Sequence, residues 1–183
     1  FASGLVDGVT TNPSLIKKSG RDPEEVYQEL IDAGVPDISM EVVGTVGEMY
    51  EEGVRLSEKF GEQATIKVNV TLIFSVAQAI LAAKAGATYV SPFVGRCNDN
   101  SFSGVELIRA ISGTYCSQGV RTKILAASLR DVHHVSRCYM YGAHVVTMPV
   151  KVLDKMYDHV LTREGLDIFQ KDFDETQKLL NNG

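Results

Sequence analysis

Short apolar runs alternate with longer amphipathic stretches along the chain. Most of the runs are continuous and rich in β-branched residues, which is typical of parallel strands covered on both faces. They predict strands at 6–10, 38–43, 64–68, 69–73, 88–91, 124–128 and 145–148. The stretches between them predict helices at 22–33, 47–60, 75–85, 104–117 and 131–141. Because several helices are followed by a glycine that can end them, the chain reads as a series of βα units.

Repeated βα units are found in closed (β/α)8 barrels and in open doubly wound sheets. No G-x-G-x-x-G or G-x-x-x-x-G-K-[ST] motif follows a predicted strand, so the phosphate-binding signatures of the open sheets are missing. Polar residues instead gather at the carboxyl ends of several strands, where a barrel has its active site. The sequence therefore predicts an α/β protein with one (β/α)8 TIM-barrel domain over residues 1–183 and a C-terminal helical tail from about residue 150.

The number of predicted strands is one short of the eight that a barrel needs. Residues 64–74 would also make an unusually long single strand, so we interpret them as two strands joined without a helix between them. We therefore expect two segments of the barrel to be absent from this chain. One would precede Phe1, and the other would lie at the junction of Val68 and Asn69.

Composition and charge exclude several classes of protein. The chain has 183 residues, of which 44% are hydrophobic and 22% charged, as expected for a globular domain with a core of its own. A net charge of −5 without any basic block argues against nucleic acid as a partner. No apolar run approaches the roughly 20 residues of a membrane span. The three cysteines and four histidines lack disulfide or metal-site spacing, so we expect no metal and a cytoplasmic location.

Two charged residues lie in or beside predicted apolar strands. Lys67 is in the strand TIKV, where an unpaired ammonium group would be costly to bury. A neutral lysine is a nucleophile that forms a Schiff base with a ketone or an aldehyde. Glu41 ends another strand, where its carboxylate could hold a water molecule and accept a proton. The alternative for both is a charged side chain that reaches solvent at a strand end.

Asn69 and Thr71 lie two residues apart on one predicted strand. Side chains at this spacing point to the same face of a strand, so both could enter a barrel and bind substrate hydroxyls. The alternative is a pair of polar side chains that satisfy each other in the core.

Two arginines follow the ends of successive strands. Arg96 comes after Ser91, and Arg130 comes directly after Ser128 and Leu129. Two guanidinium groups with nearby hydroxyls suit a phosphate monoester. The alternative for each arginine alone is a surface salt bridge.

Four short motifs resemble those of the transaldolases, in particular the small bacterial-type members and their relatives, the fructose 6-phosphate aldolases. The motifs are TTNPS at 10–14, NVTLIFS at 69–75, SPFVGR at 91–96 and AASLR at 126–130. They follow the family's order, and the resemblance runs from Gly4 to about Phe173. It implies a (β/α)8 barrel of the class I aldolase type that moves a dihydroxyacetone unit between sugar phosphates, as in the pentose phosphate pathway.

The resemblance also implies roles for individual residues. Lys67 matches the Schiff-base lysine, and Glu41 matches the carboxylate that activates the catalytic water. Residues that bind substrate hydroxyls or this water match Asn12, Asn69 and Thr71, and the phosphate and hydroxyl contacts match Ser91, Arg96, Ser128 and Arg130. Glu41 and Phe93 are the residues of transaldolases where the aldolases carry Gln and Tyr. The implied reaction needs no metal or organic cofactor, and small family members assemble as pentamers or decamers.

Two features depart from the family's pattern. The family has an aspartate for proton transfer on its first strand, and no residue of this chain can take that role. The helix between the lysine strand and the Asn-x-Thr strand is also absent, since Val68 runs directly into Asn69. These departures leave two alternatives to a transaldolase, namely a fructose 6-phosphate aldolase and a non-catalytic barrel that binds sugar phosphates.

Overall fold

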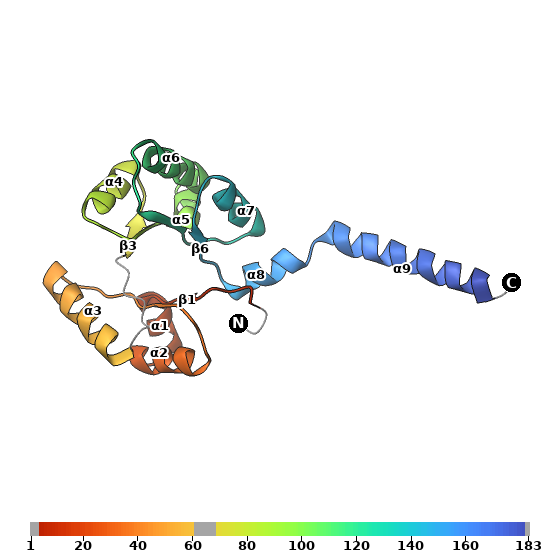
Figure 1. Cartoon of the computed structure of the whole chain (residues 1–183), viewed down its shortest axis with the longest axis horizontal. Coiled ribbons are helices and arrows are strands. Elements are labelled where there is room, and N and C mark those ends of the chain that lie inside the picture. The colour runs from red at the N-terminus through yellow and green to blue at the C-terminus, as the bar shows by residue number, and fades with distance from the viewer. Residues whose placement is uncertain (1–3, 61–68, 182–183) are drawn as a thin grey trace. The chain divides into compact units, whose positions relative to one another are not determined.

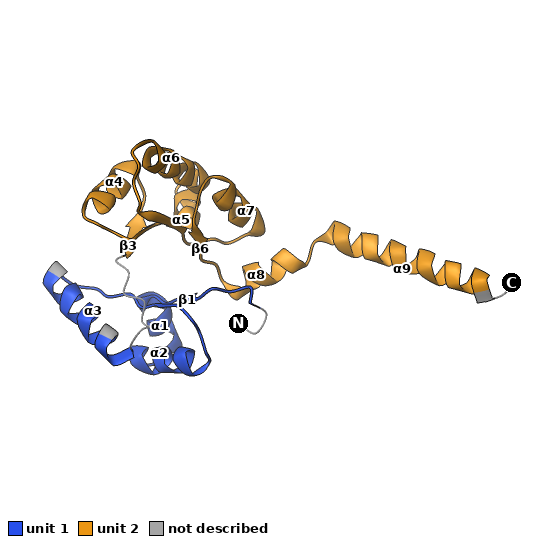
Figure 2. Cartoon of the chain, in the orientation of Figure 1, with its two compact units in different colours: residues 1–68 blue, residues 69–183 orange. Residues whose placement is uncertain are grey.

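The computed structural model describes residues 4–60 and 69–181 (Figure 1). The chain divides into two compact units, residues 1–68 and residues 69–183 (Figure 2). Both units contain parallel strands and helices, so the predicted α/β class is confirmed.

The first unit is built around one pair of parallel strands. Its elements are β1 (Val9–Thr10), α1 (Pro13–Ser19), α2 (Pro23–Asp32), β2 (Ile38–Ser39) and α3 (Val46–Phe60). β1 and β2 pair with Val9 opposite Ile38. The core includes Tyr27 and Phe60, whose rings meet edge to face with centroids 6.0 Å apart. The two strands therefore rest on a small core of their own.

The second unit contains a four-stranded parallel sheet in the order β3-β4-β5-β6. Its elements are β3 (Asn69–Ile73), α4 (Val76–Lys84), β4 (Tyr89–Pro92), α5 (Val94–Asp99), α6 (Gly104–Ser117), β5 (Lys123–Ala126), α7 (Val132–Met140), β6 (Val145–Val146), α8 (Val150–Tyr157) and α9 (Val160–Asn181). The helices α4, α6 and α7 pack side by side against the sheet (Figure 1). Since strands and helices alternate, this unit is a run of consecutive βα units, as predicted.

The core of the second unit lies between the sheet and these helices. Val90, Ile108 and Ile124 have no exposed surface, and they come from β4, α6 and β5. The buried hydroxyl of Tyr115 on α6 donates a hydrogen bond to the carbonyl oxygen of Ala79 on α4, at 2.7 Å. This hydrogen bond joins α4 and α6 in addition to their apolar contacts.

Long elements match their predictions better than short ones. The predicted strand 69–73 and helix 104–117 have the observed bounds of β3 and α6. Most other strands are shorter than predicted. For example, β2 ends at Ser39 and β6 ends at Val146. The helices α1 and α5 were not predicted, since six or seven residues are too few for a periodic pattern to show. The predicted strand 64–68 lies outside the described residues.

No helix in the described part of the chain is both long and apolar enough to cross a membrane.

Replacement of Ile108 with Ala tests the core of the second unit. Ile108 is fully buried on α6, so we expect the Ile108→Ala variant to lose about 2–5 kcal/mol of unfolding free energy, because it removes buried apolar contacts and leaves a cavity. Leu81→Ala is the matched control, since Leu81 is 69% exposed, and it should change stability by less than about 0.5 kcal/mol. Urea denaturation of both variants measures the difference; equal losses would contradict this account of the core.

Candidate functional site

Ser91 on β4 and Asn69 on β3 lie against each other across the sheet. Ser91 is only 2% exposed, and its hydroxyl donates a hydrogen bond to the Asn69 amide oxygen at 2.8 Å. With its oxygen held in this way, Asn69 retains its amide nitrogen as a donor. The pair therefore offers a donor toward a hydroxyl or carbonyl oxygen of a ligand.

The strand β3 is irregular around Thr71. The pairing of β3 with β4 shifts register between Val70 and Ile73, and Leu72 has a φ of 56°. A β-branched or bulky residue rarely adopts this left-handed conformation, which costs about 1–2 kcal/mol. Bulges of this kind bend a strand and change the direction of its side chains. The half-buried Thr71 lies inside this stretch, so its orientation depends on the bulge.

Arg96 is held over the ring of Phe93. The guanidinium carbon of Arg96 lies 5.1 Å from the centroid of the ring, which meets the ring of Phe74 edge to face. Both residues lie at the start of α5, directly after the carboxyl end of β4. This cation–π contact keeps the charge of Arg96 beside the strand end. The neighbouring Cys97 is buried, and burial raises the pKa of its thiol, which disfavours the thiolate form.

Arg130 makes a two-pronged contact with Asp99. The Arg130 atoms Nη1 and Nη2 donate to Asp99 Oδ1 and Oδ2 at 2.5 and 2.6 Å. The contact joins the loop after β5 to the end of α5. The hydrogen bonds that Arg130 donates to Asp99 raise the pKa of Arg130 above its usual value. Arg130 is therefore a permanent cation with a fixed orientation.

Gly95 allows α5 to approach the backbone after β5. A Cβ atom at Gly95 would lie 2.1 Å from the carbonyl oxygen of Ser128, 2.8 Å from its hydroxyl and 3.0 Å from Nε of Arg130. Ser128 itself has a φ of 60°, and strained backbone of this kind clusters at functional sites. Only glycine fits this contact, which brings Ser128 and Arg130 next to the helix that carries Arg96.

A chain of side-chain contacts links α5 to α7. The backbone N–H of Gly104 donates to Asn98 Oδ1 at 2.9 Å, so the Asn98 amide nitrogen is the end that faces His134 Nε2, at 3.2 Å. His134 Nε2 must then accept, and its Nδ1–H donates to Asp131 Oδ2 at 2.5 Å. Sequence reasoning missed this link, although Asp131 and His134 have the spacing of a helix cap and its third residue.

The remaining predicted residues, Asn12, Glu41 and Lys67, do not belong to the second unit. Asn12 and Glu41 belong to the first unit, where the Asn12 side chain caps α1 by accepting from the N–H of Leu15 at 2.9 Å. Glu41 is half-buried just after β2. Lys67 lies outside the described residues. The group that the structure assembles therefore consists of Asn69, Ser91, Phe93, Arg96, Ser128 and Arg130, with Thr71 on the same strand as Asn69.

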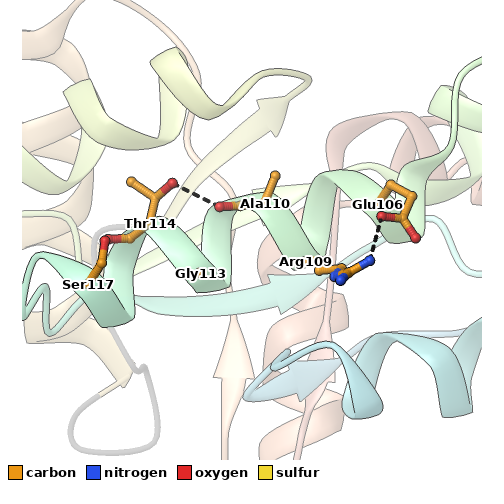
Figure 3. Close-up of a pocket in the computed structure, with 6 residues that line it drawn as sticks. All are labelled: Glu106, Arg109, Ala110, Gly113, Thr114 and Ser117. Carbon is orange, nitrogen blue, oxygen red and sulfur yellow. Dashed lines mark hydrogen bonds and ion pairs between the residues drawn. The ribbon is translucent and has the colours of Figure 1, made fainter.

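A groove of about 460 Å³ lies on the exposed face of α6 (Figure 3). Its lining includes Glu106 and Arg109, which form an ion pair at 3.5 Å, and the hydroxyl of Thr114, which donates to the carbonyl of Ala110. None of the predicted site residues lines it. Because its charges compensate each other, the groove offers little to a charged ligand. In residues 4–60 and 69–181, no group of three or more His, Cys, Asp or Glu is placed to hold a metal ion.

Comparison with known proteins points to one family. The profile of the family described as "Transaldolase/Fructose-6-phosphate aldolase" matches residues 48–182. Similar relatives include a "Probable transaldolase" of Paracoccus denitrificans, which is 46% identical over 97% of this chain and 91% of its own length. Another of that name, from Caulobacter vibrioides, is 45% identical over 96% and 90%. Among solved structures, a mandelate oxidase aligns with a TM-score of 0.41 at 19% identity, over 70% of this chain and 45% of its own.

The alignment also bears on the segments that we expect to be absent. The alignment with the Paracoccus relative extends over 199 positions, which is longer than the whole chain of 183 residues. The relative therefore contains internal residues that this chain lacks. The helix expected at the junction of Val68 and Asn69 stays a prediction.

Replacement of Gly95 with Ala tests the close approach of α5. Because the new Cβ atom would collide with the Ser128 backbone, we expect the Gly95→Ala variant to lose about 1–3 kcal/mol of stability. Gly113→Ala is the matched control on α6, where a Cβ atom meets nothing within 4 Å; it should stabilise the protein by about 0.5–1 kcal/mol through its helix propensity. Thermal and urea denaturation of both variants give the comparison, and a neutral Gly95→Ala variant would contradict the described contact.

Proposed function

The chain belongs to the transaldolase/fructose-6-phosphate aldolase family, as its four motifs predict, and we propose that it is a transaldolase acting on sugar phosphates. The fold of this family is the (β/α)8 barrel, and each unit of the chain contains parallel strands and helices, as such a barrel does. The relatives named transaldolase support a transferase. The finer assignments, namely the substrates, the Schiff base and the pathway, are parts of the proposal.

The observation that carries the proposal is the pair of arginines at the carboxyl ends of β4 and β5. Arg96 lies over the ring of Phe93, and Arg130 is oriented by Asp99. Ser128 adds a hydroxyl beside Arg130, next to the Gly95 backbone. Two oriented guanidinium groups and a hydroxyl match the charge and the acceptor atoms of a phosphate monoester. We assign this cluster to the phosphate group of the sugar.

The chemical step is assigned to Lys67. Its neutral amine attacks the C2 ketone of fructose 6-phosphate or sedoheptulose 7-phosphate, and loss of water gives a protonated imine, the iminium. A water molecule held by Glu41 and Thr71 takes the proton of the C4 hydroxyl while the C3–C4 bond breaks. The electron pair of that bond moves into the iminium, which becomes an enamine as an aldose phosphate leaves. The enamine then attacks the aldehyde of a second aldose phosphate, and hydrolysis restores the lysine.

Hydroxyl groups of the sugar are assigned to the amides and hydroxyls near the strand ends. Asn69 and Ser91 already form one hydrogen-bonded unit, and we assign Asn12 to the same role from the first unit. Phe93 supports transaldolase over aldolase, because its apolar ring offers no hydroxyl that would position water to protonate the enamine. The reaction as proposed uses no metal or organic cofactor, since the lysine itself is the electron sink. We place it in the cytoplasm and in the pentose phosphate pathway.

We also propose that the chain assembles with copies of itself, as a pentamer or a decamer. Eight large apolar side chains of α9 are exposed, each by more than half of its surface; they are Val160, Leu161, Leu166, Ile168, Phe169, Phe173, Leu179 and Leu180. A helix with this many exposed apolar residues gains stability when another surface covers them. The tail is therefore assigned to contacts between copies of the chain.

Borohydride trapping tests the role of Lys67. After incubation with fructose 6-phosphate and sodium borohydride, we expect a reduced three-carbon or six-carbon adduct on Lys67 in a peptide map. The Lys67→Met variant should carry no adduct and lose at least about 10³-fold of its turnover, because the nucleophile is gone. Lys171→Met, which changes an exposed lysine of α9, should behave like the parent protein. An unmodified Lys67 together with full phosphate binding would favour the non-catalytic binder.

Acceptor dependence separates the transaldolase from the aldolase. With fructose 6-phosphate as the donor and erythrose 4-phosphate as the acceptor, we expect steady turnover, and without the acceptor only a single turnover that leaves the enamine on the lysine. Release of free dihydroxyacetone in many turnovers without an acceptor would identify a fructose 6-phosphate aldolase instead.

Analytical ultracentrifugation tests the role of α9. The Phe169→Asp variant places a charge on the exposed apolar face, which should dissociate the assembly because burial of the charge is costly. Lys171→Asp on the same helix should leave the assembly intact. A parent protein that sediments as a monomer would contradict the proposed oligomer.

A further inference from the structure

A cavity of about 890 Å³ opens at the amino ends of β4 and β5. Its lining includes residues 86–88, which precede β4, and residues 120–122, which precede β5. The candidate site residues Ser91 and Ser128 lie at the opposite ends of the same strands. A strand of four residues is about 13 Å long, so the cavity is separated from the candidate site by the length of the sheet.

Three cations line this cavity, and none of its lining residues is acidic. The cations are Lys84 at the end of α4, Arg121 in the loop before β5, and Lys123 at the start of β5. No ion pair involves any of the three within residues 4–60 and 69–181. The chain as a whole carries a net charge of −5. The cavity is therefore a locally positive region of a protein whose net charge is negative.

Arg121 differs from all the other arginines of the described chain. Each of the others contacts a carboxylate or an aromatic ring, and these are Arg21, Arg55, Arg96, Arg109, Arg130, Arg137 and Arg163. Lys84 has a structural explanation, because a cation at the end of a helix is favoured by the helix dipole. Arg121 and Lys123 lie outside any helix, so this explanation does not extend to them.

The rest of the lining combines an apolar wall with neutral donors. Ile80 and Val120 provide apolar surface, and the exposed side chains of Thr88 and Gln118 can donate hydrogen bonds. The volume of the cavity is in the range of small-molecule sites, roughly 300–1,000 Å³. A ligand that matches all of these features carries several negative charges and also has an organic body.

We propose that this cavity binds a small organic phosphate at the amino edge of the sheet, with Arg121, Lys84 and Lys123 around its phosphate groups. A guanidinium group binds two phosphate oxygens at once, and ammonium groups act as point charges beside it. The organic part of the ligand lies against Ile80 and Val120. This site is separate from the proposed sugar-phosphate site and does not depend on the proposed transaldolase activity.

Binding of ATP and of inorganic pyrophosphate to the full chain tests the proposal. Calorimetric titration of the parent protein should give saturable binding of ATP that weakens as salt is added. Arg121→Gln should raise the Kd at least about tenfold, because it removes a charge-assisted contact. Arg109→Gln is the matched control, since Arg109 lies on α6 outside the cavity and pairs with Glu106; it should bind ATP like the parent. Circular dichroism and the Tm of each variant show that it is folded.

A further variant separates this cavity from the proposed sugar-phosphate site. Arg130→Gln should keep the ATP binding, whereas Arg121→Gln should keep the turnover of sugar phosphates. The proposal is overturned if the parent binds no ATP, if Arg121→Gln binds it unchanged, or if Arg130→Gln abolishes the binding. Pyrophosphate should bind more weakly than ATP, and equal affinity would overturn the role of the apolar wall.

Discussion

The contact between the start of α5 and the backbone after β5 is the constraint on which the candidate site depends. Gly95 has no Cβ atom, which lets the helix pack closely against Ser128. A Cβ atom at this position would lie 2.1 Å from the carbonyl oxygen of Ser128. The N–H of Val94 donates to the carbonyl of Ala127 at 3.0 Å, which fixes the same approach through the backbone. Arg96 and Arg130 owe their common location to this contact, because each is attached to one of its two sides.

The last turn of α5 is also held by polar contacts. Asp99 binds Arg130 at the end of the helix, and Asn98 faces His134 of α7. These contacts cross from one βα unit to the next, so they couple the orientation of a loop to the packing of two helices. A side chain that is fixed in this way loses little conformational freedom when a ligand binds, which is the physical basis of preorganisation.

The apolar pattern of the sequence was sufficient to predict the βα repeat but not the contacts that shape the site. Long elements such as α6 show their period over several turns, whereas α5 is too short to show one. The motif residues Ser91, Arg96 and Arg130 could be predicted because they follow recognisable strands. The partners Asp99 and His134 could not, since a surface acid and a helical histidine are ordinary in sequence. Asp99 contacts Arg130, which is 31 positions away in the chain, and His134 contacts Asn98, which is 36 positions away.

The ion pair of Arg130 with Asp99 is compatible with binding of a phosphate group by the same arginine. A guanidinium group has five N–H donors, and Asp99 uses one on Nη1 and one on Nη2. Three donors remain, among them the N–H of Nε, the atom that lies beside Gly95. A phosphate oxygen can thus approach Arg130 from the side of α5, where Arg96 is also located. Asp99 then orients the arginine and leaves these donors available.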